Sequence, residues 1–174
     1  YLYESAEQFL AHTSAFVEEG LEAGEAVLVA VDRGKIAALS ERLGSAARHV
    51  EFADMAVAGR NPARIIPLWS QFLDGHRDQG VRGIGEPIWP ERSPAEMAEC
   101  HLHELLLNTA FDDGPGWSLM CPYDVGRLAP HVVETAHRTH PHVASPRRVD
   151  PCPTYQRVGD HPFRGELPAP PTDA

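Results

Sequence analysis

Apolar and polar residues follow two periods along this chain, one typical of amphipathic helices and one typical of buried strands. Apolar residues three and four positions apart predict helices at Ser5–Glu22, Arg33–Leu43, Pro62–Arg77, Ser93–Ala110 and Pro130–Thr139. Short apolar runs between them predict strands at Leu2–Tyr3, Ala26–Val31, Val50–Phe52, Val81–Gly85 and Trp117–Cys121. Because the run Ala26–Val31 is apolar throughout, it is typical of a parallel strand covered on both faces. The alternation predicts a three-layer α/β fold, with a mostly parallel sheet between helices that are joined by right-handed crossovers.

Several helix ends carry their own signals. Ser5 is placed to cap the first helix, with Gln8 three residues later, and Gly24 follows its end. The sequence Ser93-Pro94-Ala95-Glu96 has the residues of a capping box with proline at the first helical position. Pro67 lies inside the predicted helix Pro62–Arg77, which predicts either a kink or a later start.

The chain has 174 residues, which is enough for one α/β domain. We expect this domain to span residues 1–144 and order to fade after His140. Residues 145–174 are rich in proline and poor in apolar residues, and we expect them to be a linker toward an output domain that this sequence does not include.

Charge and composition narrow the possible partners. The net charge is −10, which disfavours nucleic acid as a partner because phosphate binding needs a basic surface. No apolar run approaches the ~20 residues that span a membrane, and no signal peptide is visible. The three cysteines form no CxxC pair, as expected for reduced thiols. These features predict a cytoplasmic domain with neither a membrane nor a nucleic-acid partner.

Polar and aromatic residues gather where two predicted strands end. Ligands of open α/β sheets bind along the carboxyl ends of the strands. Two residues follow the strand Val81–Gly85, three lie at or just after the end of the strand Trp117–Cys121, two lie on the helix Ser93–Ala110, and two follow the third strand. We therefore expect a ligand site lined by Glu86, Trp89, Cys121, Tyr123 and Asp124, with His101 and Glu104 behind them and Arg60 and Asn61 as a polar clamp.

Each of these residues also has a purely structural interpretation. Glu86 could cap the helix at Ser93 or pair with an arginine, and Trp89 could be a lid, a ligand-stacking wall or a cover for the sheet edge. The polar stripe His101–Glu104–Asn108 could be a hydrogen-bond network inside the protein or the wall of a pocket. Cys121 could be a thiol of the core.

Standard cofactor motifs are missing. The chain contains neither GxxxxGK[ST] nor a GxGxxG turn after its first strands, and His101-Leu-His103-Glu104 is not HExxH. The cluster His137, His140 and His142 is of a kind that binds nickel or zinc opportunistically. Pro122 lacks the backbone N–H that could stabilise an oxyanion beside Cys121. We therefore assign no cofactor, no metal and no catalytic residue.

Several short motifs, in this order over roughly residues 1–143, resemble the MEDS family, the methanogen/methylotroph DcmR-type sensory domain. They are Leu2-Tyr3 before a helix, Gly20-Leu-x-x-Gly24-Glu25, Phe52-Ala-Asp54-Met55, Gly59-Arg60-Asn61-Pro62-Ala63-Arg64, Arg82-Gly-Ile-Gly-Glu86-Pro87-x-Trp89, Glu99-Cys-x-Leu-His103-Glu104, Leu119-x-Cys121-Pro-Tyr123-Asp124 and His140-Pro141.

The resemblance implies a core similar to the RecA/KaiC-type P-loop fold without a working Walker A loop. It also implies a sensory role for small organic signals. Similar actinobacterial regulators carry such a domain ahead of a histidine-kinase-like ATPase of the anti-sigma-factor type, which implies a sigma factor or an anti-sigma antagonist as a further partner.

We expect a sensory module that binds a small molecule, controls the linked output domain and acts in transcription regulation, with a homodimer as one possible state. The sequence leaves two alternatives open. One is a protein-interaction module with a vestigial pocket, and the other is a small hydrolase that uses the His, Glu and Asp side chains.

Overall fold

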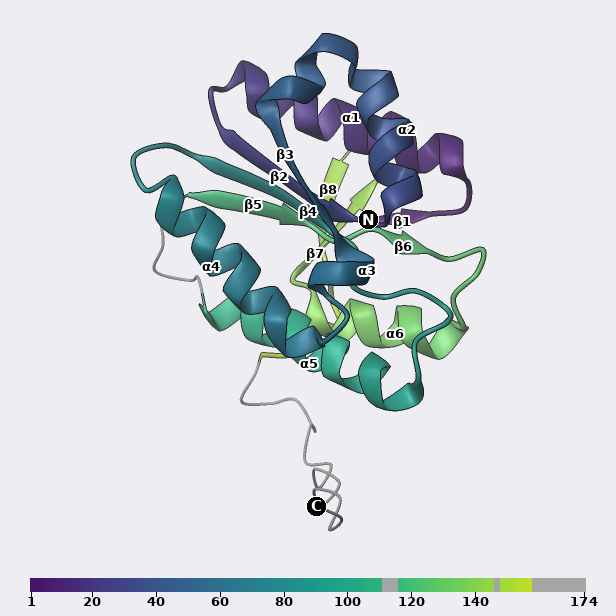
Figure 1. The fold of residues 1–174 in the computed structure, drawn as a ribbon. Helices are drawn as coiled ribbons and strands as arrows, with labels where there is room; N and C mark the ends of the chain where they lie inside the picture. The colour runs from purple at the N-terminus through teal and green to yellow at the C-terminus, as the bar shows by residue number, and fades with distance from the viewer. Residues whose placement is uncertain (111–115, 146–147, 158–174) are drawn as a thin grey trace, which may run out of the picture.

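A parallel sheet forms the centre of the computed structural model, which describes residues 1–110, 116–145 and 148–157. Its strands are β2 (Ala26–Val31), β3 (Val50–Asp54), β4 (Val81–Gly85) and β5 (Trp117–Met120). They are hydrogen-bonded in the order β3-β2-β4-β5, and every pair is parallel (Figure 1). The mostly parallel sheet predicted from the apolar runs is confirmed.

Two very short strands form a separate two-stranded sheet beyond the end of β5. β1 (Leu2–Tyr3) pairs in parallel with β6 (Tyr123–Asp124), which follows β5 after Cys121 and Pro122. The Tyr123 N–H donates to the Tyr1 carbonyl oxygen at 2.8 Å. This pairing brings the first residues of the chain beside the end of β5.

Helices cover both faces of the sheet (Figure 1). The longer helices are α1 (Ala6–Glu22), α2 (Arg33–Leu43), α4 (Ile65–Gly75), α5 (Pro94–Ala110) and α6 (Pro130–Thr139). The short helical segments are η1 (Gly44–His49), α3 (Met55–Ala58) and η2 (Pro62–Arg64). The helices α1 and α2 pack on one face, and α4 and α5 lie on the other. The three-layer α/β architecture is therefore confirmed.

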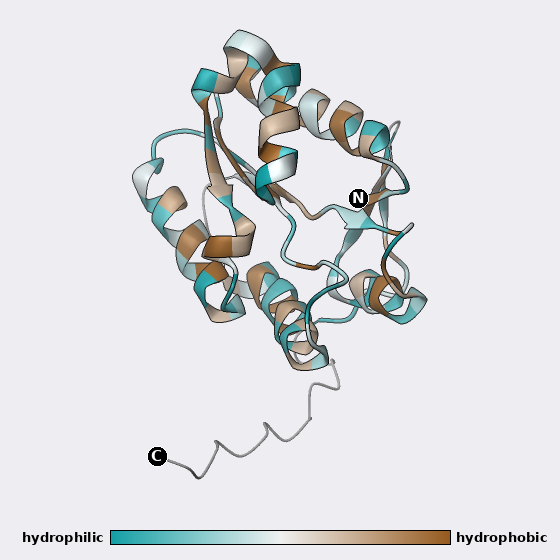
Figure 2. Ribbon diagram, turned by 45° about the vertical axis from the view of Figure 1, so that its right-hand side comes forward, coloured by the Kyte–Doolittle hydropathy of each residue, from teal (hydrophilic) through white to brown (hydrophobic). Residues whose placement is uncertain are grey.

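The two faces of β2 explain why a continuous apolar run is needed there. Side chains alternate between the faces of a strand. Val27, Val29 and Val31 pack with apolar residues of α1 and α2, whereas Leu28 and Ala30 pack with apolar residues of α4 and α5. Figure 2 shows apolar residues along the central strands and on the helices around them. The sheet thus lies between two apolar layers.

The helix ends follow the predicted signals. The Ser5 hydroxyl accepts from the Gln8 N–H, and Ser93 and Glu96 form the reciprocal bonds of a capping box. The helix predicted from Pro62 is divided into η2 and α4. Pro67 is therefore the third residue of α4, where no N–H is needed for an intrahelical bond, so the later start is confirmed.

The prediction that order fades after His140 was wrong for the part that the structure describes. β7 (His142–Ser145) and β8 (Arg148–Pro151) form an antiparallel pair, which we call the C-terminal hairpin. Cys152 anchors this hairpin, because its N–H donates to the Pro141 carbonyl oxygen at 2.8 Å and its Sγ donates to the His137 carbonyl oxygen at 3.0 Å. The domain boundary at residue 144 stays a prediction. Most of the predicted linker, residues 158–174, lies outside the described residues.

In the described ranges, none of the helices combines the length and the apolar character needed to cross a membrane.

Candidate functional site

The carboxyl ends of β1, β2 and β4 bring four polar residues together. Glu86, which follows β4, is 5 % exposed. Its Oε1 accepts from the Tyr3 hydroxyl at 2.6 Å, and its Oε2 lies 2.6 Å from the Lys35 Nζ. The same Nζ lies 3.3 Å from Oδ2 of Asp32, the residue that caps α2. We call these four residues the Lys35 network.

Burial dominates the electrostatics of this network. It raises the pKa of Glu86 above its ordinary value, although the Lys35 ammonium and the Tyr3 hydroxyl both act to lower it. Both carboxylate oxygens of Glu86 have partners. Of the two structural interpretations of Glu86, pairing with a cation is the one observed, but the cation is Lys35 and not an arginine.

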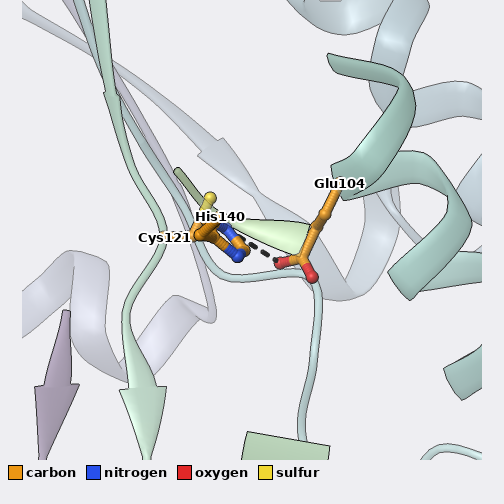
Figure 3. Close-up of side chains that lie close together, drawn as sticks. All are labelled: Glu104, Cys121 and His140. Atoms are coloured by element: carbon orange, nitrogen blue, oxygen red, sulfur yellow. Dashed lines mark ion pairs between the residues drawn. The ribbon is translucent and has the colours of Figure 1, made fainter. Parts of the chain in front are cut away.

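A second polar cluster lies at the end of β5, between α5 and α6. We call it the Glu104 cluster, and its members are His101 and Glu104 on α5, Cys121 after β5, Tyr123 in β6 and His140 after α6. The Tyr123 hydroxyl donates to Glu104 Oε2, and His101 Nδ1 lies 3.6 Å from the same oxygen. His140 Nε2 lies 4.0 Å from Glu104 Oε1 (Figure 3).

Glu104 is only 2 % exposed, yet its surroundings favour the charged form. Burial alone would raise its pKa, but His140, His101 and the Tyr123 hydroxyl outweigh burial and hold the pKa below its ordinary value. Burial and the Glu104 charge raise the pKa of the Cys121 thiol. Burial lowers the pKa of His140. The cluster therefore holds a carboxylate beside a neutral thiol and a neutral imidazole at neutral pH.

Two atoms of this cluster are buried without a hydrogen-bond partner among the described residues. They are Glu104 Oε1 and His101 Nδ1. Buried polar atoms are nearly always paired in folded proteins, and an unpaired one costs about 1–3 kcal/mol. Buried polar atoms without partners are typical of a ligand-binding site.

The Glu104 cluster borders a cavity of about 820 Å³. β1 pairs with β6 and not with β5, so the outer edge of β5 faces this cavity. The other walls come from α1, α5 and the C-terminal hairpin. The residues that line the cavity include Glu104, Cys121 and His140 in one wall, Trp117 and Ser118 on β5, and Ala144, Ser145, Arg148 and Val149 on the hairpin.

Of the nine residues expected at the site, Glu104 and Cys121 line the cavity. Tyr123 and His101 lie behind them in the Glu104 cluster, and Glu86 belongs to the Lys35 network. The structure does not place Trp89, Asp124, Arg60 or Asn61 at the cavity.

These four residues have other surroundings. The guanidinium of Arg92 lies 3.7 Å from the centre of the Trp89 ring. The Asp124 carboxylate accepts from the Gly126 N–H, and Asn61 caps η2 by accepting from the Ala63 N–H. The Arg60 side chain is exposed.

Sequence reasoning missed four residues that complete these clusters, and one of them, Asp32, carried no signal beyond its place before a predicted helix. A lone lysine in an amphipathic helix usually lies in solvent, so nothing marked Lys35. Tyr3 was seen only as part of a strand. His140 was noted with His137 and His142, but the three diverge: His137 contacts Cys152, and His142 is exposed. His140 is recognised as a member of the Glu104 cluster only in the structure, where the end of α6 lies close to the end of β5.

The Glu104 cluster does not have the arrangement of a cysteine-dependent hydrolase. In such a triad, the thiol and the acid contact opposite nitrogens of the imidazole. Here His140 Nδ1 lies 2.9 Å from the Ala136 carbonyl oxygen, so only Nε2 can face the acid. The Cys121 thiol is also held in its neutral form, which is a poor nucleophile.

Fold and site together define a parallel α/β domain with a buried, incompletely paired polar cluster at the carboxyl edge of its sheet. The model of one protein family matches residues 1–141, and its description is MEDS, the MEthanogen/methylotroph, DcmR Sensory domain. The chain therefore belongs to the MEDS family, which is a family of sensory domains.

No curated protein and no solved structure matches the chain. The likeness of its core to the RecA/KaiC-type fold accordingly stays a prediction.

Proposed function

We propose that this domain binds a small organic signal in the cavity beside the Glu104 cluster and thereby controls a linked output domain. The observation that carries the proposal is the buried Glu104 Oε1 in the cavity wall, which has no hydrogen-bond partner among the described residues. A ligand with a polar group at this end and an apolar body would satisfy the oxygen and contact the apolar wall. Membership of a sensory family supports the same conclusion.

The C-terminal hairpin offers a route from the cavity to the rest of the protein. Four of its residues, Ala144, Ser145, Arg148 and Val149, line the cavity. A ligand changes an output only if it binds two states of the protein with different affinities. A ligand that contacts the hairpin would favour one position of the hairpin, and the chain continues directly from β8 toward residues 158–174.

The proposal extends to the parent protein. The output would be a histidine-kinase-like ATPase domain of the anti-sigma-factor type, as in similar actinobacterial regulators, and its partner would be a sigma factor or an anti-sigma antagonist. The module would work in the cytoplasm, without contacting nucleic acid or membrane, and a homodimer is one state in which it could act.

Titration calorimetry with defined probes tests ligand binding. The probes are short-chain alcohols, aldehydes, carboxylates and halogenated hydrocarbons, each added to the purified domain. A probe that binds only the folded state also stabilises it, by about 2.7 kcal/mol at one hundred times its Kd. Thermal unfolding with the same probes therefore provides a second readout.

Ser118 offers a matched pair of variants for this test. Its side chain is exposed and lies in the cavity wall on β5, so a large side chain can enter the cavity without disturbing the core. Ser118→Trp should abolish binding of an active probe, whereas Ser118→Ala should retain it. Equal binding to both variants would place the ligand elsewhere. If none of the probes binds, the protein-interaction module becomes the better interpretation.

A further inference from the structure

Three potential metal ligands converge in the wall of the cavity. Glu104, Cys121 and His140 each offer one ligand atom, and these atoms lie within 4.8 Å of one another. Figure 3 shows Glu104 extending from its helix toward His140, with Cys121 beside the imidazole. The three residues come from α5, from the end of β5 and from the end of α6. Their convergence is therefore a property of the fold and not of a local sequence motif.

Neighbouring groups already orient two of the three ligands. The Ala136 carbonyl oxygen, 2.9 Å from His140 Nδ1, holds the ring proton on that nitrogen and leaves the lone pair of Nε2 free. The Tyr123 hydroxyl donates to Glu104 Oε2, which leaves Oε1 for another partner. Hydrogen bonds of this kind fix the tautomer of a ligating histidine and the orientation of a ligating carboxylate.

The oxygen that supports ligand binding in the cavity also supports a bound ion at this position. Glu104 Oε1 is buried, lies on the side of His140 Nε2, and has no hydrogen-bond partner among the described residues. A divalent cation would satisfy it. With Glu104 and a Cys121 thiolate as ligands, the charges of the two anions and the cation also cancel, so that no net charge is buried.

We propose that Glu104, Cys121 and His140 bind a Zn²⁺ ion through one oxygen, one sulfur and one nitrogen atom. A thiolate with an imidazole selects zinc over the hard cations Mg²⁺ and Ca²⁺. Tetrahedral zinc with ordinary bond lengths sets its ligand atoms roughly 3.4 Å apart. The distance of 4.0 Å between His140 Nε2 and Glu104 Oε1 therefore closes with small side-chain rotations.

Three protein ligands leave the fourth position of the ion open, as in zinc sites that bind a water molecule or a substrate. All three ligands line the cavity, so this position faces it. The Cys121 thiol loses its proton to solvent when the sulfur binds the ion. A small molecule with an oxygen, nitrogen or sulfur donor could then replace the bound water. That last step rests on the proposed sensory function, whereas the metal site does not.

Another thiol–imidazole pair provides the matched control. Cys152 Sγ lies 3.6 Å from His137 Nδ1, but the sulfur also donates a hydrogen bond to the His137 carbonyl oxygen. Among the described residues, no acidic side chain joins Cys152 and His137 to form a potential metal site. Cys152→Ser and His137→Gln therefore remove the same chemical groups as Cys121→Ser and His140→Gln, at a position where we expect no ion.

Cobalt titration of the purified domain tests the site, because Co²⁺ occupies zinc sites and reports its ligands by absorption. We expect one Co²⁺ per chain, thiolate-to-cobalt absorption in the near ultraviolet, and displacement of cobalt by Zn²⁺. Cys121→Ser should abolish the thiolate absorption, and His140→Gln and Glu104→Gln, which remove ligand atoms, should weaken binding by at least the roughly tenfold that the loss of a ligand's hydrogen-bond partner costs. Cys152→Ser and His137→Gln should bind cobalt as the unmodified protein does.

Two results would overturn the inference. One is a protein that takes up no stoichiometric Co²⁺ or Zn²⁺, and the other is thiolate absorption that survives Cys121→Ser but disappears in Cys152→Ser. Circular dichroism without metal shows whether each variant folds, and His140→Gln carries the test if Cys121→Ser does not. No organic probe is present in this experiment, so its failure leaves the test of ligand binding untouched.

Discussion

Replacing Lys35 with methionine tests whether Glu86 carries its charge in the folded protein. The substitution keeps most of the aliphatic length but removes the ammonium group that lies 2.6 Å from Glu86 Oε2. Removing one partner of a fully buried ion pair costs about 3–5 kcal/mol. The Lys35 side chain is 27 % exposed, so solvent screens part of this interaction. We expect the free energy of unfolding at neutral pH to fall by about 2 kcal/mol.

The pH dependence of this loss distinguishes charge from packing. The pKa of Glu86 is raised on folding, so the folded state holds its proton more tightly than the unfolded state. Stability therefore falls as pH rises from about 4.5 through the pKa of the folded protein. Without Lys35 this pKa rises further, so the fall extends to higher pH. The difference between the variant and the unmodified protein should be small near pH 4.5 and largest above neutrality.

Urea unfolding at pH 5 and pH 8 measures both effects. The double variant Lys35→Met/Glu86→Gln should recover most of the stability lost at pH 8, because no unpaired carboxylate is left. Arg33→Met is the matched control: Arg33 lies on the same helix and is 85 % exposed, so its loss should change stability by less than about 0.5 kcal/mol. An equal loss at both pH values, or no recovery in the double variant, would refute the reasoning.

Three further predictions concern stability. Both ring nitrogens of His103 are buried without hydrogen bonds among the described residues, and burial lowers the pKa of His103 to about 4. The free energy of unfolding should therefore fall by about 3 kcal/mol as pH falls from 6.5 to 4, and His103→Leu should reduce that fall when urea unfolding is measured across this pH range. In Gly83→Ala the new Cβ would lie 2.7 Å from Trp69 Cζ3, so urea unfolding should show that the free energy of unfolding falls by about 1–3 kcal/mol. Gly116→Ala, whose new Cβ would meet no atom within 4 Å, should cost far less, and equal losses in the two variants would contradict the packing argument. Ser93→Ala removes one half of a capping box and should lower the thermal unfolding temperature by the equivalent of about 1 kcal/mol; an unchanged temperature would mean that the cap is dispensable.

The sequence was a good guide to the elements whose signals are local. A continuous apolar run identified β2, because a parallel strand covered on both faces needs apolar residues on both. Serine caps identified the starts of α1 and α5, and Pro67 indicated the later start of α4. Each of these features depends on residues within a few positions of one another.

The C-terminal hairpin had no such signal. Its strands are short, partly polar and close to several prolines, so the sequence predicted a linker there. Pairing between β7 and β8, and the anchoring of Cys152 against the end of α6, make it part of the fold.

The candidate site was predictable only in part, for the same reason. Glu104 and Cys121 were recognised because they lie on elements that the pattern placed at the carboxyl edge. Their partner His140 lies 36 residues after Glu104 and 19 residues after Cys121 in the sequence, and Lys35 contacts Glu86 although the two residues follow different strands. Such contacts depend on the order of strands in the sheet, which the apolar pattern does not encode.

Lys35 is the only lysine in the sequence. Reagents that modify primary amines therefore react with one side chain, which belongs to the Lys35 network, and with the α-amine of the chain. Reductive methylation with isotopically enriched formaldehyde would place a single pair of NMR-visible methyl groups beside Glu86 and Tyr3. The domain thus carries a natural position for a spectroscopic label, whose chemical shift would follow any change at the carboxyl edge of the sheet without mutation of the protein.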